Sequence, residues 1–156
     1  MESVYLETTL ISYLASRPSR DLLVAAHQQT THEWWANRRQ GFECYVSQVV
    51  IDEASSGDPE EAKRRMQLIE DLPALEVTHE TESLARAILA SGAIPPRAVR
   101  DAAHAAVAAV NDMDYLLTWN CKHLANAQII RRLSIVCNRL GYNMPVICTP
   151  EELMGE

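Results

Sequence analysis

The sequence predicts an α/β fold, a three-layer α/β/α sandwich with a central parallel sheet. Short apolar runs alternate along the whole chain with longer segments in which apolar residues recur at helical spacing. Such alternation is typical of parallel strands joined by helices that cover both faces of the sheet. The 156 residues, 47% of them apolar, suffice for one core. We therefore predict a single domain over residues 1–156.

The first part of the chain predicts two strands and three helices. Gly41 closes the longest helix, because glycine is favoured just past a helix end. We assign Leu22, Leu23, Ala26 and Trp34 to the inner face of that helix. The predicted elements are a strand at Val4–Leu6, helices at Thr9–Ala15 and Arg20–Arg39, a strand at Glu43–Ser47 and a helix at Val49–Ala54.

The middle of the chain contains a strong helix start. Asp58 is a capping residue, Pro59 suits the first helical position, and Glu61 follows three positions after the cap. The elements predicted here are a helix from Pro59 that ends at Pro73, a strand at Leu75–Val77 and a helix capped by Thr78 or Thr81.

The last part of the chain begins with an alanine-rich segment, whose small side chains allow a helix to lie close against the sheet. Thr149 and Glu152 form a capping box around Pro150, which predicts a terminal helical turn. The other predicted elements are a helix at Arg97–Val110, a strand at Tyr115–Thr118, a helix from Asn120 to about Leu140 and a strand at Val146–Cys148.

Four oxygen-bearing side chains from distant segments fall at predicted strand ends or on helices beside them. They are Glu7 after the first strand, Glu53 on the helix after the second, Asp101 on the alanine-rich helix and Asn120 after the fourth strand. In a parallel sheet the functional crevice lies outside the carboxyl ends of the strands. Oxygen ligands gathered there suit Mg²⁺ or Mn²⁺. A site of this kind indicates phosphodiester hydrolysis.

Asp52 and Glu53 compete for one of these positions. Adjacent helical residues point about 100° apart, so only one of the two acids can face inward. Val49, four residues before Glu53, marks the Glu53 side as the inner one. We therefore choose Glu53, because a buried carboxylate needs a partner or a metal.

In the order and spacing of its motifs the chain resembles the PIN domain family, and within it the VapC-like toxins of toxin–antitoxin pairs. The resemblance spans Val4 to about Pro150. It is carried by V-Y-L-E-T-T-L-I-S-Y-L from Val4, V-S-Q-V-V-I-D-E from Val46, R-D-A-A-H-A-A-V-A-A from Arg100 and Y-L-L-T-W-N-C-K-H-L from Tyr115.

This resemblance implies a PIN-like fold and a Mg²⁺- or Mn²⁺-dependent endoribonuclease. It also implies an RNA substrate, a homodimer and neutralisation by a small antitoxin protein. The metal-binding and catalytic residues that it implies are Glu7, Glu53, Asp101 and Asn120.

Two of these residues depart from the family pattern, which usually has aspartate where this chain has Glu7 and Asn120. The amide removes a negative charge, which weakens the expected affinity for a cation. Each position also has a simpler structural interpretation. Glu7 and Asp101 carry negative charge that suits a helix N-terminus, and Asn120 is a good cap for the helix after it.

Several neighbouring polar residues have two interpretations each. His104, three residues after Asp101 on the same helix face, either contacts a phosphate or water or is hydrogen-bonded within the core. Lys122 and His123 either reach the scissile phosphate or lie on a solvated face. Cys121 follows Asn120, and the other three cysteines are expected to be mostly small buried thiols.

The net charge of −7 argues against capture of nucleic acid by a broad basic face, and Arg131-Arg132 is interpreted as part of a solvated helix face. It does not exclude a nuclease, since a bound metal offsets clustered acids. No apolar stretch is long enough to cross a membrane. The acidic start lacks the features of a signal peptide, so we expect a cytoplasmic protein.

Three other functions remain open. The departures at Glu7 and Asn120, and at Thr9, where the family usually has asparagine, also suit a catalytically weakened PIN-like module that binds RNA or protein. Trp34 and Trp35 would suit an interaction protein with an aromatic face, or else pack in the core. A phosphatase or response-regulator-like domain would need an aspartate nucleophile and a lysine at strand ends, and neither is apparent.

Overall fold

The computed structural model describes residues 1–155, and Glu156, the last residue of the predicted domain, lies outside them. Within this range, five parallel strands form one sheet in the order β3-β2-β1-β4-β5. The strands are β1 (Ser3–Leu6), β2 (Glu43–Ser47), β3 (Ala74–Leu75), β4 (Tyr115–Leu117) and β5 (Val146–Cys148).

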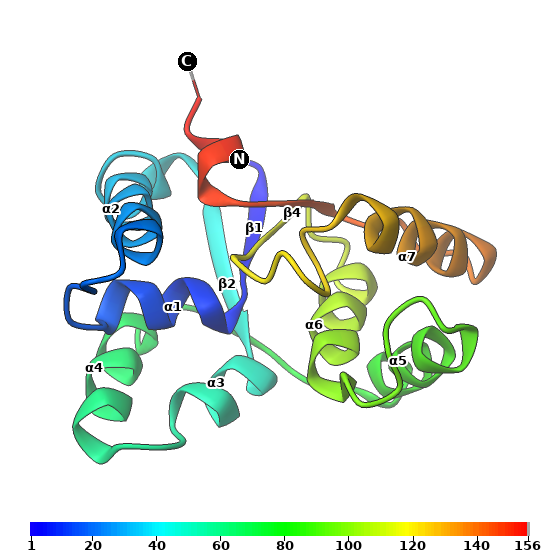
Figure 1. Ribbon diagram of the computed structural model, residues 1–156. Coiled ribbons are helices and arrows are strands. Elements are labelled where there is room, and N and C mark those ends of the chain that lie inside the picture. Colours follow the sequence, from blue (N-terminus) through cyan, green and yellow to red (C-terminus); the bar gives the residue numbers. More distant parts are fainter. Residues whose placement is uncertain (156) are drawn as a thin grey trace.

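Seven α-helices in the described part of the chain cover the sheet. Figure 1 shows α1 to α4 against one face and α5 to α7 against the other. The predicted three-layer α/β/α sandwich with a parallel sheet is therefore confirmed. The helices are α1 (Thr8–Ala15), α2 (Leu22–Asn37), α3 (Gln48–Ala54), α4 (Pro59–Ile69), α5 (His79–Ser91), α6 (Val99–Val110) and α7 (Ala127–Arg139); short 3₁₀ turns are η1 (Arg39–Gly41) and η2 (Pro150–Leu153).

β1 is the central strand and is completely buried from Val4 to Leu6. It pairs with β2 on one side and with β4 on the other, where Leu6 lies opposite Leu117. Because the strands run parallel, their carboxyl ends meet at the same edge of the sheet. Glu7 therefore enters the same region as the residues that end β2 and follow β4.

Local capping signals set several helix ends as the sequence predicted. The Asp58 carboxylate accepts a hydrogen bond from the N–H of Glu61 (3.1 Å), and Pro59 is the first residue of α4. Thr149 and Glu152 form the predicted capping box at the start of η2. Of the two threonines proposed for α5, Thr78 is the cap.

The predicted inner face of α2 is wrong at three of its four residues. Leu22 and Leu23 are 87% and 67% exposed, and Ala26 is exposed as well. The buried residues of α2 are Gln28, Thr31 and Trp34, so two polar side chains occupy the inner face in place of these three. Trp34 is completely buried in the second half of the helix, so it belongs to the core. Trp35 is half-buried and lies beneath the Arg39 guanidinium.

The start of α7 also differs from the prediction. The helix begins at Ala127, and the Asn126 side chain caps it by accepting hydrogen bonds from the N–H groups of Gln128 and Ile129. Asn120 lies in the loop between β4 and α7, so its interpretation as the cap of this helix is wrong. The loop carries Asn120 away from α7 and leaves its side chain free for other partners.

Cys44, Cys137 and Cys148 are buried, as the sequence suggested, and Cys121 is exposed. Burial raises the pKa of the Cys44 and Cys137 thiols to about 11 and that of Cys148 to about 12. These thiols are therefore uncharged at neutral pH. Within residues 1–155, no helix is both long and apolar enough to cross a membrane.

Candidate metal centre

Glu7 stands where β1 ends and α1 begins. Its backbone N–H donates to the carbonyl of Leu117 on β4 (3.1 Å), which holds Glu7 at the edge of the sheet. The residue is only 3% exposed, and Oε1 accepts hydrogen bonds from the hydroxyls of Thr9 and Thr118, both at 2.5 Å. Glu7 occupies the N-cap position of α1, but its side chain makes no capping hydrogen bond. Helix capping therefore does not explain why this carboxylate is buried.

Glu53 reaches the same place from α3, which follows β2 directly. Its Oε1 accepts a hydrogen bond from the Thr8 hydroxyl (2.8 Å) and lies 2.6 Å from His104 Nε2. Burial tends to raise the pKa of Glu53. The hydrogen bonds from His104 and Thr8, together with the electrostatic attraction of His104 and Arg100, outweigh burial, so the pKa of this carboxyl lies below its ordinary value. Glu53 is therefore ionised at neutral pH.

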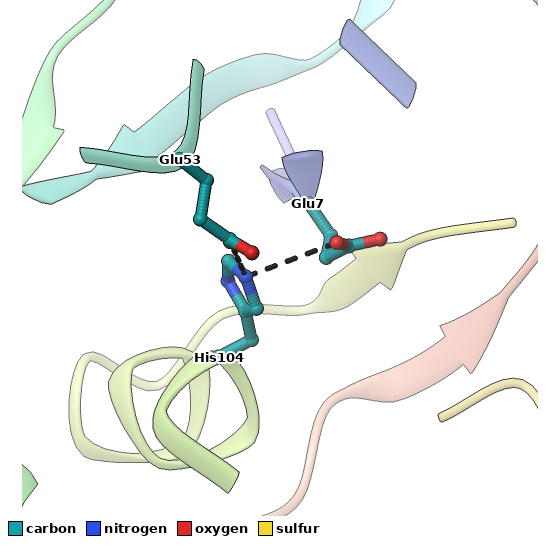
Figure 2. A group of neighbouring side chains, drawn as sticks. All are labelled: Glu7, Glu53 and His104. Carbon is teal, nitrogen blue, oxygen red and sulfur yellow. Dashed lines mark hydrogen bonds and ion pairs between the residues drawn. The ribbon is translucent and has the colours of Figure 1, made fainter. Parts of the chain in front are cut away.

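His104 joins the two acids from α6, on the other side of the sheet. The residue is completely buried, and its Nε2 lies 3.8 Å from Glu7 Oε2 in addition to its short contact with Glu53. Figure 2 shows the three side chains pointing toward one another from the end of β1, from α3 and from α6. A buried imidazole thus lies between two carboxylates.

The Tyr5 hydroxyl, on β1, orients the imidazole of His104. It lies 2.6 Å from His104 Nδ1 and 2.7 Å from the Ser47 hydroxyl, so it links the end of β2 to α6. Burial raises the pKa of the Tyr5 phenol far above its ordinary value. Tyr5 therefore stays protonated at neutral pH and has one proton to donate.

The donor atoms of Glu7, Glu53 and His104 all lie within 4.8 Å of one another, and the group can hold a metal ion. Two ligands at right angles around an ion the size of Mg²⁺ stand roughly 3 Å apart. The separation of 3.8 Å between Glu7 and His104 suits such an arrangement with a small adjustment. The 2.6 Å contact between His104 and Glu53 is a hydrogen bond, which a cation bound to both would replace.

Asp101 and Asn120 meet in a second group with His123. The Asn120 amide donates to Asp101 Oδ1 (3.0 Å), and His123 Nδ1 lies 2.8 Å from Asp101 Oδ2. The amide oxygen of Asn120 accepts the backbone N–H of His123 (2.9 Å). Asp101 is not among the described residues whose ligand atoms gather with Glu7. The structure thus divides the four predicted residues between two groups, Glu7 with Glu53 and Asp101 with Asn120.

Thr118 connects the two groups. Its hydroxyl donates to Glu7 Oε1 and accepts the backbone N–H of Asn120 (2.9 Å), so one side chain touches both. Thr118 is completely buried where β4 ends. The loop after β4 therefore carries the second group at a fixed position beside the first.

The choice of Glu53 over Asp52 agrees with the structure. Asp52 is exposed and accepts a hydrogen bond from Gln48 on its own helix, whereas Glu53 points into the cluster. From the sequence, His104 is interpretable only as a phosphate or water contact or as a core histidine. Its place between two acids could not be read from its own helix, because both acids come from other segments.

No family model matches this sequence, and no curated protein is significantly similar to it.

Proposed function

We propose that the protein is a metal-dependent endoribonuclease of the PIN-like, VapC-like kind and acts as the toxin of a toxin–antitoxin pair. The observation that carries the proposal is the convergence of Glu7 and Glu53 with His104 at the carboxyl ends of the strands. Two carboxylates held this close would repel each other without a cation or a proton between them. The Arg100 guanidinium, an exposed group 3.9 Å from Glu53 Oε2, supplies part of this positive charge, and a divalent ion would supply the rest.

The donor set fits the ions expected from the sequence. Carboxylate oxygens suit both Mg²⁺ and Mn²⁺, whereas the imidazole nitrogen favours Mn²⁺, because Mg²⁺ is bound almost entirely through oxygen. When bound, such an ion lowers the pKa of a coordinated water and stabilises negative charge on a phosphoryl group.

The chain's own residues hold and orient the ligands. Glu7 and Glu53 would bind the ion, and the hydroxyls of Thr8, Thr9 and Thr118 fix the two carboxylates by hydrogen bonds. Outer hydrogen bonds of this kind set the direction and basicity of metal ligands. The pair of Asp101 and Asn120 lies beside them, where it can position a water or the RNA backbone.

The decisive experiment is cleavage of single-stranded RNA with Mn²⁺, with Mg²⁺ or with a chelator. We expect cleavage with the metals and none with the chelator. Glu53→Gln keeps the shape of the side chain but removes its charge. It should reduce the cleavage rate by more than the roughly 10–100-fold loss typical of residues outside the ligand shell. Asp101→Asn should reduce the rate as well.

Asp52→Asn is the matched control, because Asp52 is the exposed neighbour of Glu53 on the same helix. It loses the same charge and should cleave RNA at the parental rate. Cleavage by Glu53→Gln equal to that of the parent would mean a contaminating nuclease and would refute the proposal.

The toxin role and the partners rest on the sequence resemblance and are tested separately. We propose that the protein forms a homodimer and is neutralised by a small antitoxin. Induced expression in bacteria should arrest growth, and the Glu53→Gln variant should not. Sedimentation of the purified protein should give the mass of a dimer.

A second candidate function is a catalytically weakened module that binds RNA or protein. It is favoured by the hydrogen bonds that already engage Glu53 and Asp101, since these carboxylates have partners without a cation. Calorimetry with Mn²⁺ separates the two candidates. Retained RNA affinity with no heat of Mn²⁺ binding would favour the weakened module.

A further inference from the structure

Two adjoining depressions run along α7, and both are lined by Ala93 and Arg132. The larger has a volume of about 360 Å³ and also includes Lys122 and His123, while the smaller, of about 180 Å³, includes Arg139. We call this continuous surface the α7 groove. Its larger part is of the size that small ligands occupy in proteins.

The charge of the α7 groove is opposite to that of the whole chain. Lys122, Arg132 and Arg139 line it, and among residues 1–155 no aspartate or glutamate does. The chain as a whole has 21 acidic against 14 basic residues. A basic groove on an acidic protein attracts polyanions at one place, because the remaining surface repels them.

The floor of the groove is apolar. Ile94, Pro95 and Ile129 line the larger depression beside the cationic side chains. An apolar floor with a basic rim suits a nucleotide, whose base is largely apolar on its face and whose phosphate is charged. A flexible single strand can turn its bases toward the apolar residues. Such a groove therefore suits a single strand better than it suits a rigid duplex.

The groove begins beside the candidate metal centre. His123 both lines the larger depression and contacts Asp101 through Nδ1. Asp101 is bonded to Asn120, whose backbone is held by the Thr118 hydroxyl that also binds Glu7. Figure 1 shows the loop between β4 and α7, to which Thr118, Asn120 and His123 belong, passing from the end of β4 to the start of α7. A strand bound at the metal centre can therefore continue along α7.

We propose that the α7 groove binds the single-stranded RNA next to the cleaved bond, with its phosphates on Lys122, Arg132 and Arg139. The choice of RNA rests on the proposed nuclease function. The interpretation of Arg131-Arg132 as part of a solvated face then applies only to Arg131, because Arg132 lines both depressions.

The test measures the affinity for a short unstructured RNA by fluorescence anisotropy over a range of salt concentrations, with a chelator present to prevent cleavage. The parent is compared with the double variant Arg132→Gln/Arg139→Gln. Loss of two phosphate contacts on a single strand should make the negative slope of log affinity against log salt shallower by about 1.4. The dissociation constant should rise by about tenfold or more at low salt.

Arg17→Gln/Arg20→Gln is the matched control, since both arginines are exposed and lie between α1 and α2, in the other helical layer. It makes the same change in net charge and should leave the slope unchanged. Circular dichroism verifies that each variant is folded.

The results separate this inference from the proposed function. If the α7 and control variants bind RNA equally well, or if the parent does not bind RNA, the groove inference is refuted. Cleavage of RNA by the parent in Mn²⁺ would still support the nuclease. RNA binding that depends on Arg132 and Arg139, without any cleavage in Mn²⁺, would support the groove and refute the nuclease.

Discussion

Tyr5 is the residue on which the orientation of His104 depends. It is completely buried, and its hydroxyl is the link between Ser47 on β2 and His104 on α6. Buried polar groups that lose a partner cost about 1–3 kcal/mol, since they have already given up their contact with water. The Tyr5 hydroxyl therefore satisfies the hydrogen-bonding needs of two buried groups, His104 Nδ1 and the Ser47 hydroxyl.

Tyr5→Phe should lower the free energy of unfolding by about 1–3 kcal/mol. The ring still fills its space, but His104 Nδ1 and the Ser47 hydroxyl lose a hydrogen-bond partner. Urea denaturation measures this difference. Tyr45→Phe is the control: Tyr45 lies opposite Tyr5 in the sheet, and its hydroxyl makes no hydrogen bond within residues 1–155. Equal stability of the two variants would mean that the Tyr5 hydroxyl contributes nothing.

At the scale of elements, α6 brings His104 to the acids because its packing face is made of alanines. Ala102, Ala105 and Ala106 are completely buried, and their small side chains let α6 pack closely against its neighbours, of which α5 is the most extensive. A larger residue at these positions would push α6 outward. The short contact between His104 and Glu53 depends on this close approach.

The loop from Thr118 to Asn126 is the second element that shapes the site. It contains two asparagines with different roles: the Asn120 side chain donates a hydrogen bond to Asp101, and the Asn126 side chain caps α7. Residues of α7 line the α7 groove. The position at which α7 begins therefore sets where the groove lies relative to the metal centre.

Asn126→Ala should destabilise the protein by about 1 kcal/mol, because the first N–H groups of α7 lose their side-chain acceptor. The midpoint of urea unfolding reports this loss. Asn138→Ala is the control on the same helix, since Asn138 is exposed. Its effect should be within about 0.5 kcal/mol. A loss of stability confined to Asn138→Ala would contradict the assignment of the cap.

On the scale of the whole molecule, the candidate metal centre joins elements from both helical layers. Glu53 comes from α3 on one side of the sheet, His104 from α6 on the other, and Glu7 from the central strand. A cation bound by all three would tie these layers together at the edge of the sheet. Since unfolding separates the three ligands, binding should stabilise the folded protein.

Mn²⁺ at a hundred times its dissociation constant should stabilise the protein by about 2.7 kcal/mol. For a domain of this length that corresponds to a rise in Tm of roughly 5–11 °C. Thermal unfolding monitored by circular dichroism, with and without a chelator, checks this value. Asp52→Asn should show the parental rise and Glu53→Gln little or none. An equal rise in Tm for the two variants would mean that Mn²⁺ binds at a site that does not include Glu53.

Much of the fold follows from the sequence because its signals are local. β2 and β5 occupy the predicted residues, α4 begins at the predicted cap, and the parallel three-layer class is confirmed. Hydrophobic spacing, capping residues and turns act within a few positions of the chain. They do not determine which side of a long helix meets the core, since α2 buries Gln28 and Thr31 and leaves Leu22 and Leu23 exposed.

The sequence alone determined which segments carry acids to the ends of the strands, because strand ends and helix faces follow from residue order. Only the tertiary structure decided which side chains meet there. His104 lies with Glu7 and Glu53, whereas Asp101 is hydrogen-bonded to Asn120 and His123. The physical reason is that these contacts join residues up to about a hundred positions apart, and the packing of α3 and α6 on opposite sides of β1 sets their distances.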